Sequence, residues 1–253
     1  MLWSNATIQE QYMKDYLQDL VTHTYDLGNI DLIKITGTEN ETIINALAED
    51  KSVVIEGKFS TPSEAFVGTF GMPNLNRLKI LLNLQEYKEG AKLSLTHHKE
   101  SKEPTGIEFE NSAGDFHNNY RFMSQEVVDN KLKVPKFKGV TWHVEFQPTV
   151  AAIQRLKMQS QAHSDETCFQ AKTENGNLVF YFGDHSTHTG NFVFHPKVTG
   201  NLVKAWAWPI KKIISILDLT GDKTFRISND GAAMITVNTG LATYDYILPA
   251  QTL

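Results

Sequence analysis

The spacing of apolar residues predicts four helices along the chain. Residues 8–22 place Tyr12, Met13, Tyr16, Leu17 and Leu20 on one face at about 100° per residue. Three more helices are predicted at residues 74–84, 148–162 and 209–217, each beginning beside a proline, which suits a helix start. The inward-facing residues expected on these three are Leu75, Leu78, Leu81 and Leu82; Val150, Ile153 and Leu156; and Ile210, Ile213, Ile214 and Leu217.

Short or alternating apolar runs predict strands between these helices. The expected strands are 30–35, 52–59, 65–71, 92–97, 105–110, 117–123, 141–146, 168–172, 178–182, 191–195, 204–208, 224–228, 233–237 and 242–248. Residues 40–49 fit either a strand or one short helix. Turn signals such as Asn229-Asp230-Gly231 separate neighbouring strands and favour antiparallel hairpins. The expected fold class is therefore α+β.

The two halves of the chain repeat one order of elements. Each has a helix, several strands, an apolar strand that runs into a proline-started helix at Pro73 or Pro209, and three more strands. This order predicts two similar domains, each with two helices packed on antiparallel sheets. Residues 124–139 show no period of a helix or a strand and are interpreted as an extended connector. The predicted boundaries are 1–124, 125–139 for the connector, and 140–253.

Composition excludes several classes of protein. The chain has 253 residues with a net charge of −5, which argues against a uniformly basic protein that coats nucleic acid. The single cysteine, Cys168, excludes an intramolecular disulfide and a cysteine-based zinc site. The chain carries no phosphate-binding loop and no Gly-x-Ser-x-Gly motif. We expect no catalytic residues, no cofactor, no bound metal, no signal peptide and no membrane span.

The histidines suggest an alternative hypothesis, a metal site. His185 and His188 lie near Asp184, His163 and His195, and such a group could bind a metal. The pair lacks the i, i+4 spacing of zinc-binding helices and falls in a stretch typical of a hairpin loop. A metal-dependent enzyme that uses residues 184–195 remains the less favoured alternative.

Basic residues lie on or beside the outer faces of all four predicted helices. They are Lys14, Arg77, Lys79, Arg155, Lys211 and Lys212. Most acidic residues lie elsewhere, although Glu10 and Asp15 share the first helix. Lysine and arginine on helices can contact phosphates without reading base sequence. On any single helix such residues usually do no more than solvate its surface, but the same bias on all four helices of an acidic protein is harder to explain in that way.

Two stretches resemble a known family. Residues 69–81, with Gly71-Met72-Pro73 followed by Leu75, Leu78 and Leu81, resemble a segment of sliding DNA clamps. Residues 221–250 resemble the end of the same family, with a Gly-Asp turn, a Ser-x-Asp-Gly hairpin and a closing strand. Here Ala232 replaces the usual proline after the hairpin glycine. The similarity is to two-domain clamps, which include proliferating cell nuclear antigen and T4-type phage clamps, and the divergence suggests a viral or phage origin.

The resemblance implies a DNA clamp fold, a homotrimeric ring around duplex DNA, and tethering of a DNA polymerase. It also implies that the six basic helix residues, Lys14, Arg77, Lys79, Arg155, Lys211 and Lys212, bind the phosphates of double-stranded DNA without sequence preference. It implies that the polymerase and the clamp loader bind through short peptides. The implied peptide pocket combines the connector with the chain end: Val127, Val128, Leu132, Val134, Pro135, Tyr246, Leu248, Pro249 and Ala250. Family position suggests 117–123 and 168–182 as the strands that join subunits. The expected location is the cytoplasm of the infected host cell, or a nucleus. A monomeric clamp-like polymerase accessory factor is the other alternative.

Overall fold

The chain divides into two compact units. The computed structural model describes residues 5–184 and 188–251, with only the backbone described for residues 5–12. The first unit comprises Met1–Pro135 and Thr239–Tyr244, and the second comprises Lys136–Asn238 and Asp245–Leu253. The division at Pro135 falls inside the expected connector. The boundaries predicted from the sequence stay a prediction.

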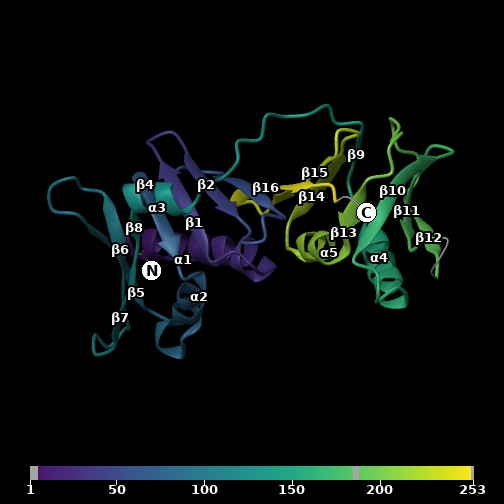
Figure 1. Cartoon of the computed structure of the whole chain (residues 1–253). Helices are drawn as coiled ribbons and strands as arrows, with labels where there is room; N and C mark the ends of the chain where they lie inside the picture. Colours follow the sequence, from purple (N-terminus) through teal and green to yellow (C-terminus); the bar gives the residue numbers. More distant parts are fainter. Residues whose placement is uncertain (1–4, 185–187, 252–253) are drawn as a thin grey trace. The chain divides into compact units, whose positions relative to one another are not determined.

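The first unit is built on two antiparallel sheets (Figure 1). One has the order β8-β4-β1-β2-β3 and the other the order β5-β6-β7. The strands are β1 (Leu32–Gly37), β2 (Thr42–Leu47), β3 (Val54–Phe59), β4 (Gly68–Pro73), β5 (Lys92–His97), β6 (Pro104–Glu110), β7 (His117–Arg121) and β8 (Met123–Ser124). The helices are α1 (Asn5–His23), α2 (Leu75–Asn83) and α3 (Gln125–Lys131), with short 3₁₀ turns at Tyr25–Leu27, Glu64–Phe66 and Gln85–Tyr87.

The second unit also has two antiparallel sheets, with the orders β12-β11-β10-β13 and β16-β15-β14-β9. The strands are β9 (Val144–Phe146), β10 (Cys168–Glu174), β11 (Asn177–Phe182), β12 (Gly190–His195), β13 (Ala207–Pro209), β14 (Asp222–Ile227), β15 (Ala232–Asn238) and β16 (Ala242–Pro249). The helices are α4 (Val150–Ala162) and α5 (Ile210–Asp218). Stacked phenylalanine rings fill the core between α4 and its sheet, for example Phe169 on Phe180 and Phe180 on Phe194.

The tip of the last hairpin belongs to the first unit. The Tyr244 hydroxyl donates a hydrogen bond of 2.8 Å to the Asp19 carboxylate of α1, 225 residues earlier in the chain. The Tyr244 ring stacks on His23, with ring centroids 4.9 Å apart. A side chain on Gly57 would meet this ring at 2.9 Å, so glycine is required for the ring to pack there. The end of the chain thus completes the core around its first helix.

Several predicted elements are corrected by the structure. Residues 42–47 form a strand, which settles the ambiguous segment. The expected connector is not extended throughout, because Gln125–Lys131 forms α3. The expected strand at 204–208 is confined to Ala207–Pro209. On α5, Ile216 is fully buried whereas Ile214 is only half-buried.

Val150 was expected to face inward, yet it is 76% exposed. The buried face of α4 is formed by Ala152, Ile153 and Leu156. At about 100° per residue, Val150 lies roughly 120° from the centre of that face. The Thr149 hydroxyl caps the helix by accepting a hydrogen bond from the Ala152 amide at 3.1 Å, which fixes where α4 begins.

Candidate nucleic-acid and partner interfaces

Positive charge is concentrated on three of the four predicted helices. Within their bounds, α2, α4 and α5 carry six lysines or arginines and one acid, Asp218. Helix α1 differs, because Glu10, Asp15 and Asp19 outnumber its only lysine, Lys14. The basic bias is therefore clear on α2, α4 and α5, whereas α1, on which the bias was already expected to be imperfect, carries more acidic than basic residues.

Three of the candidate DNA-binding residues make contacts within their own unit. The Lys14 ammonium donates hydrogen bonds to the backbone carbonyls of Tyr87 at 2.6 Å and Lys88 at 3.3 Å. Lys79 pairs with Asp26 at 2.7 Å. The Arg155 guanidinium lies over the Phe192 ring and donates to the Val193 carbonyl at 3.3 Å.

Arg77 and Lys211 are exposed, and among the described residues neither has an ion pair or hydrogen bond from its side chain. Lys212, beside Lys211 on α5, is half-buried and has a contact of its own. A basic side chain that makes no ion pair or hydrogen bond within the described chain can bind a phosphate without first breaking another interaction. Arg77 and Lys211 are therefore the two candidates best placed to bind an external anion.

The connector is fixed to the first unit where it begins. Val128 of α3 is fully buried, and its side chain packs over Gly71 of β4, where an added Cβ would lie only 2.7 Å from Val128 Cγ2. Lys34 of β1 pairs with Asp129 of α3 at 2.5 Å. The hydrogen bond from Lys34 is the main reason that the Asp129 pKa is lowered from its usual value.

The other connector residues of the expected peptide pocket are more accessible. Val127 is 41% exposed, Leu132 and Val134 are half-buried, and Pro135 is exposed. The buried Val128 therefore supports this surface from beneath and does not line it.

The chain-end residues of the expected pocket also divide by burial. Tyr246 and Leu248 of β16 are fully buried, whereas Pro249 is exposed and Ala250 is half-buried. The half-buried Trp206 ring lies against Gly231, where an added Cβ would be 3.3 Å from the ring. Its indole N–H donates to the Asn229 carbonyl at 2.8 Å. Only Pro249 and Ala250 of the four expected residues can be reached from outside this unit.

Among the described residues, the sheet edges that lie beside a helix with exposed apolar residues include β7 in the first unit and β12 in the second. In the part of the chain that the structure describes, β7 pairs only with β6, and β12 pairs only with β11. The expectation that residues 168–182 supply an edge is wrong, because β10 and β11 each have a neighbour on both sides. Unpaired edge strands present free N–H and C=O groups to another strand.

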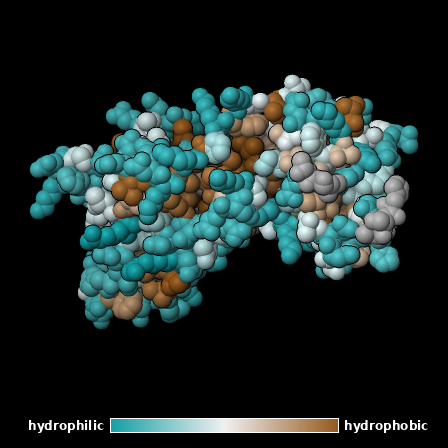
Figure 2. Space-filling model, in the orientation of Figure 1, coloured by the Kyte–Doolittle hydropathy of each residue, from teal (hydrophilic) through white to brown (hydrophobic). Residues whose placement is uncertain are grey.

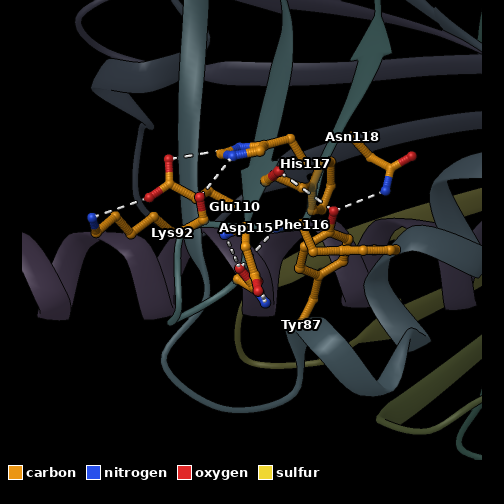
Figure 3. Close-up of polar contacts among 10 residues, drawn as sticks. Tyr87, Lys92, Glu110, Asp115, Phe116, His117 and Asn118 are labelled. Atoms are coloured by element: carbon orange, nitrogen blue, oxygen red, sulfur yellow. Dashed lines mark hydrogen bonds and ion pairs between the residues drawn. The ribbon is translucent and has the colours of Figure 1, made fainter.

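Polar side chains surround β7 and are joined by ion pairs and hydrogen bonds (Figure 3). Glu110 lies between Lys92 at 3.4 Å and His117 at 3.8 Å, and the Asn118 amide donates to the Tyr87 hydroxyl at 2.8 Å. Tyr120 anchors β7 from within, because its buried hydroxyl donates to the Pro73 carbonyl. Burial raises the Tyr120 pKa.

A hollow of about 530 Å³ lies on this face, lined by Arg77, Lys92, Ser94, Glu108, Phe109, Glu110, His117, Asn118 and Asn119. Helix α2, which contacts β7, exposes 52% of Ile80 on its outer face. Figure 2 shows hydrophobic areas within a largely hydrophilic surface.

The surroundings of β12 come from α4, which lies against the same sheet (Figure 1). The outer face of α4 exposes Val150 and Met158, the latter by 65%. On the flank nearer β12, Arg155 donates to the Val193 carbonyl and the Gln159 amide donates to the Asn191 carbonyl at 3.4 Å. This edge therefore combines strand backbone, two polar side chains and an apolar helix face.

The alternative of a metal site in residues 184–195 finds no support. Among the described residues, no group of three or more His, Cys, Asp or Glu side chains could hold a metal ion. His185 lies outside the described residues. His188 is exposed, and the buried His163 ring stacks on Phe182.

Nearly the whole chain matches solved structures that include several clamps. A chain from the structure of the C-terminal region of FEN-1 bound to A. fulgidus PCNA matches with a TM-score of 0.66 and 10% identity, covering 97% of this chain and 96% of that chain. PCNA from Thermococcus kodakaraensis matches with a TM-score of 0.63 and 11% identity, covering 96% and 97%. Proliferating cellular nuclear antigen from Entamoeba histolytica matches with a TM-score of 0.64 and 9% identity, covering 95% of this chain and 95% of that chain.

The protein has the DNA clamp fold. No family model matches its sequence, and no curated protein is similar enough to count as a match. The clamp fold therefore persists here at a level of identity at which sequence comparison alone finds no relative. Among the described residues, no helix is both long and apolar enough to cross a membrane.

The sequence correctly predicts that Met158 faces outward, but it missed two other exposed apolar residues, Ile80 and Val150. Ile80 lies off the buried face in a helical projection of α2, whereas Val150 could be placed outward only once Ala152, Ile153 and Leu156 were known to form the buried face of α4. The open edge of β12 could not have been found in this way, because the order of strands in a sheet is decided by tertiary pairing.

Proposed function

We propose that this protein is a sliding clamp, a non-enzymatic scaffold that closes around duplex DNA and tethers a DNA polymerase. The observation that carries the proposal is the clamp fold over nearly the whole chain, in both units. The proposal is supported by the charge distribution. The protein has a net charge of −5, yet α2, α4 and α5 are basic, which would direct DNA to the helices and away from other surfaces.

Ring closure would join β7 of one copy to β12 of the next. These are open edges on different units, so pairing them gives a head-to-tail interface that can be repeated until a ring closes. Three copies would supply six units. Ile80 beside β7, and Val150 and Met158 beside β12, offer apolar area that a second copy would cover.

DNA would be held through phosphates. Arg77 and Lys211 are the first contacts that we propose, because both are exposed and uncommitted within the described chain. Lys14, Lys79, Arg155 and Lys212 stay candidates that would have to leave or share their present partners. Contacts of this kind bind all sequences alike, as a protein that slides requires.

Partner peptides would contact two exposed surfaces. One is formed by Val127, Leu132, Val134 and Pro135 of the connector, and the other by Pro249 and Ala250 of the chain end. A structural neighbour was solved with the C-terminal region of FEN-1 bound, which supports the idea that this fold accepts a peptide segment. The polymerase and the clamp loader are the partners that we propose.

The test of ring closure is Val193→Pro, analysed by native mass spectrometry. Proline removes the backbone N–H that an added strand would use and is tolerated on edge strands. We expect wild-type protein at three times 28.5 kDa and Val193→Pro at the mass of one chain. Val193→Thr keeps the N–H and a branched side chain, so it should assemble as wild type does.

A wild-type protein that stays monomeric at micromolar concentration, with or without DNA, would contradict ring closure. It would favour the monomeric accessory factor instead. Stimulation of a polymerase on primed DNA would then separate that factor from a protein with no role in synthesis.

Identity of only about 10% to archaeal and amoebal clamps is consistent with a viral or phage source. We propose that the protein acts in the compartment of the host cell that holds the replicating DNA.

A further inference from the structure

Two side chains of α4 donate hydrogen bonds to backbone carbonyls of β12. Arg155 donates to the Val193 carbonyl at 3.3 Å, and Gln159 donates to the Asn191 carbonyl at 3.4 Å. Arg155 is held in position by the Phe192 ring, whose centroid lies 5.1 Å from its guanidinium carbon. Two donors thus reach two acceptors on one short strand.

The spacing of the acceptors indicates which side of β12 they occupy. In an antiparallel ladder, alternate residues turn their N–H and C=O groups to the same side. Asn191 and Val193 are two residues apart, so their carbonyls point the same way. Since β11 covers one side of β12, side chains arriving from outside the ladder indicate that these carbonyls face the open edge.

Close packing fixes α4 beside the strand. A Cβ on Gly190 would lie 2.3 Å from His163 Nε2 and 3.3 Å from Gln159 Oε1, so only glycine lets the end of α4 approach β12 so closely. The buried His163 ring in turn stacks on Phe182. Arg155 and Gln159 therefore project from a helix whose position along β12 is set by the core.

We propose that Arg155 and Gln159 form a removable cap on the open edge of β12. In a separate subunit they satisfy the two carbonyls and hinder pairing with an unsuitable strand, a hazard of any exposed edge. When the edge strand of a second copy arrives, its N–H groups replace the two side chains. The cap thus weakens and delays assembly. The inference rests on the strand-paired assembly proposed above and concerns its regulation.

The test compares self-association of wild type with the double variant Arg155→Ala/Gln159→Ala by sedimentation velocity without DNA. Removing two exposed hydrogen bonds that assembly must otherwise break should lower the dissociation constant about tenfold, equivalent to ~1.4 kcal/mol. Association should also become faster in stopped-flow light scattering. Adding Val193→Pro to the double variant should abolish the gain, because the gain acts through the edge of β12.

A matched control is Lys138→Ala/Gln161→Ala. It removes the same charge and one glutamine from exposed positions in the same unit, and it should leave the dissociation constant unchanged. Circular dichroism and the urea midpoint of each variant establish that it folds.

The outcomes separate the two proposals. If wild type assembles and the double variant assembles no more tightly, the cap is refuted and strand-paired assembly stands. If wild type is monomeric but the folded double variant assembles through the edge, the cap is supported and the ring proposed for the wild type fails. If both stay monomeric, both proposals are overturned.

Discussion

Replacing Gly71 by alanine tests how the connector is anchored. An ideal Cβ at this position lies 2.7 Å from Val128 Cγ2, 2.8 Å from Val128 Cβ and 3.2 Å from Met123 Cβ. Carbon atoms in contact prefer about 3.5–4.0 Å, so α3 would have to move by about 1 Å. Valine cannot avoid the clash by rotation, because branching at Cβ restricts its rotamers.

The expected cost of Gly71→Ala is about 2 kcal/mol, within the range for overpacked cores. Val128→Ala alone should also cost about 2 kcal/mol, because it removes two fully buried methyl groups and leaves a cavity. In the double variant, the new methyl group enters the space vacated by Cγ2, but the contact with Cβ at position 128 remains. We therefore expect only partial rescue, with a coupling energy of about 1 kcal/mol.

Urea unfolding followed by far-ultraviolet circular dichroism measures these free energies. Asn130→Ala on the exposed side of the same helix is the control, and its effect should add to that of Gly71→Ala. If the effects of Gly71→Ala and Val128→Ala are additive to within about 0.3 kcal/mol, the two residues are not packed together as described and the argument is wrong.

Three other predictions concern charge and partner binding. Because the pKa of Asp129 is lower in the folded than in the unfolded state, its pairing with Lys34 should stabilise the protein at pH values above the unfolded-state pKa. This stabilisation should be lost as the pH falls through the folded-state pKa. Lys34→Met should remove this acid dependence, as measured by urea unfolding at several pH values. Lys211→Ala should reduce the salt slope of DNA binding by about 1, measured by fluorescence anisotropy on two unrelated duplexes, whereas Lys99→Ala on an exposed turn should leave it unchanged. Leu132→Ser should abolish binding of the polymerase C-terminal peptide in calorimetry while the native mass stays that of wild type, and retained binding would place the peptide elsewhere.

The sequence was most informative where one face of an element is buried. Strand β5 was predicted with its exact bounds, and β1, β3 and β15 show the expected alternation of buried and less buried residues. Helices α2 and α5 were found from their apolar faces and the neighbouring prolines. These features depend on local periodicity, which a single sequence displays directly.

Helix α3 could not be found by the same reasoning. It has seven residues, of which only Val128 is buried, so no repeating apolar spacing marks it. Its stability depends on Gly71 and Lys34, which lie far away in the sequence. A short helix held mainly by tertiary contacts shows little periodicity of its own.

The candidate site was predicted less well than the fold, for a related reason. The sequence identified the cations but not their partners: the partner of Lys79 is Asp26, 53 residues away, and that of Arg155 is a carbonyl on β12. It also assigned Tyr246 and Leu248 to a surface although both are fully buried. Which side chains remain available for binding depends on contacts that form only after the chain has folded.

The hydrogen bond between Tyr244 and Asp19 has a consequence for biosynthesis. A ribosome releases the first helix long before the residues that complete its surroundings, because the two partners are 225 residues apart. The core of the first unit cannot close until Tyr244 has emerged, although domains usually fold in the order of their synthesis. A nascent chain that ended after Pro135 would expose the surface that Tyr244 covers. Premature termination should therefore yield fragments that cells remove by proteolysis.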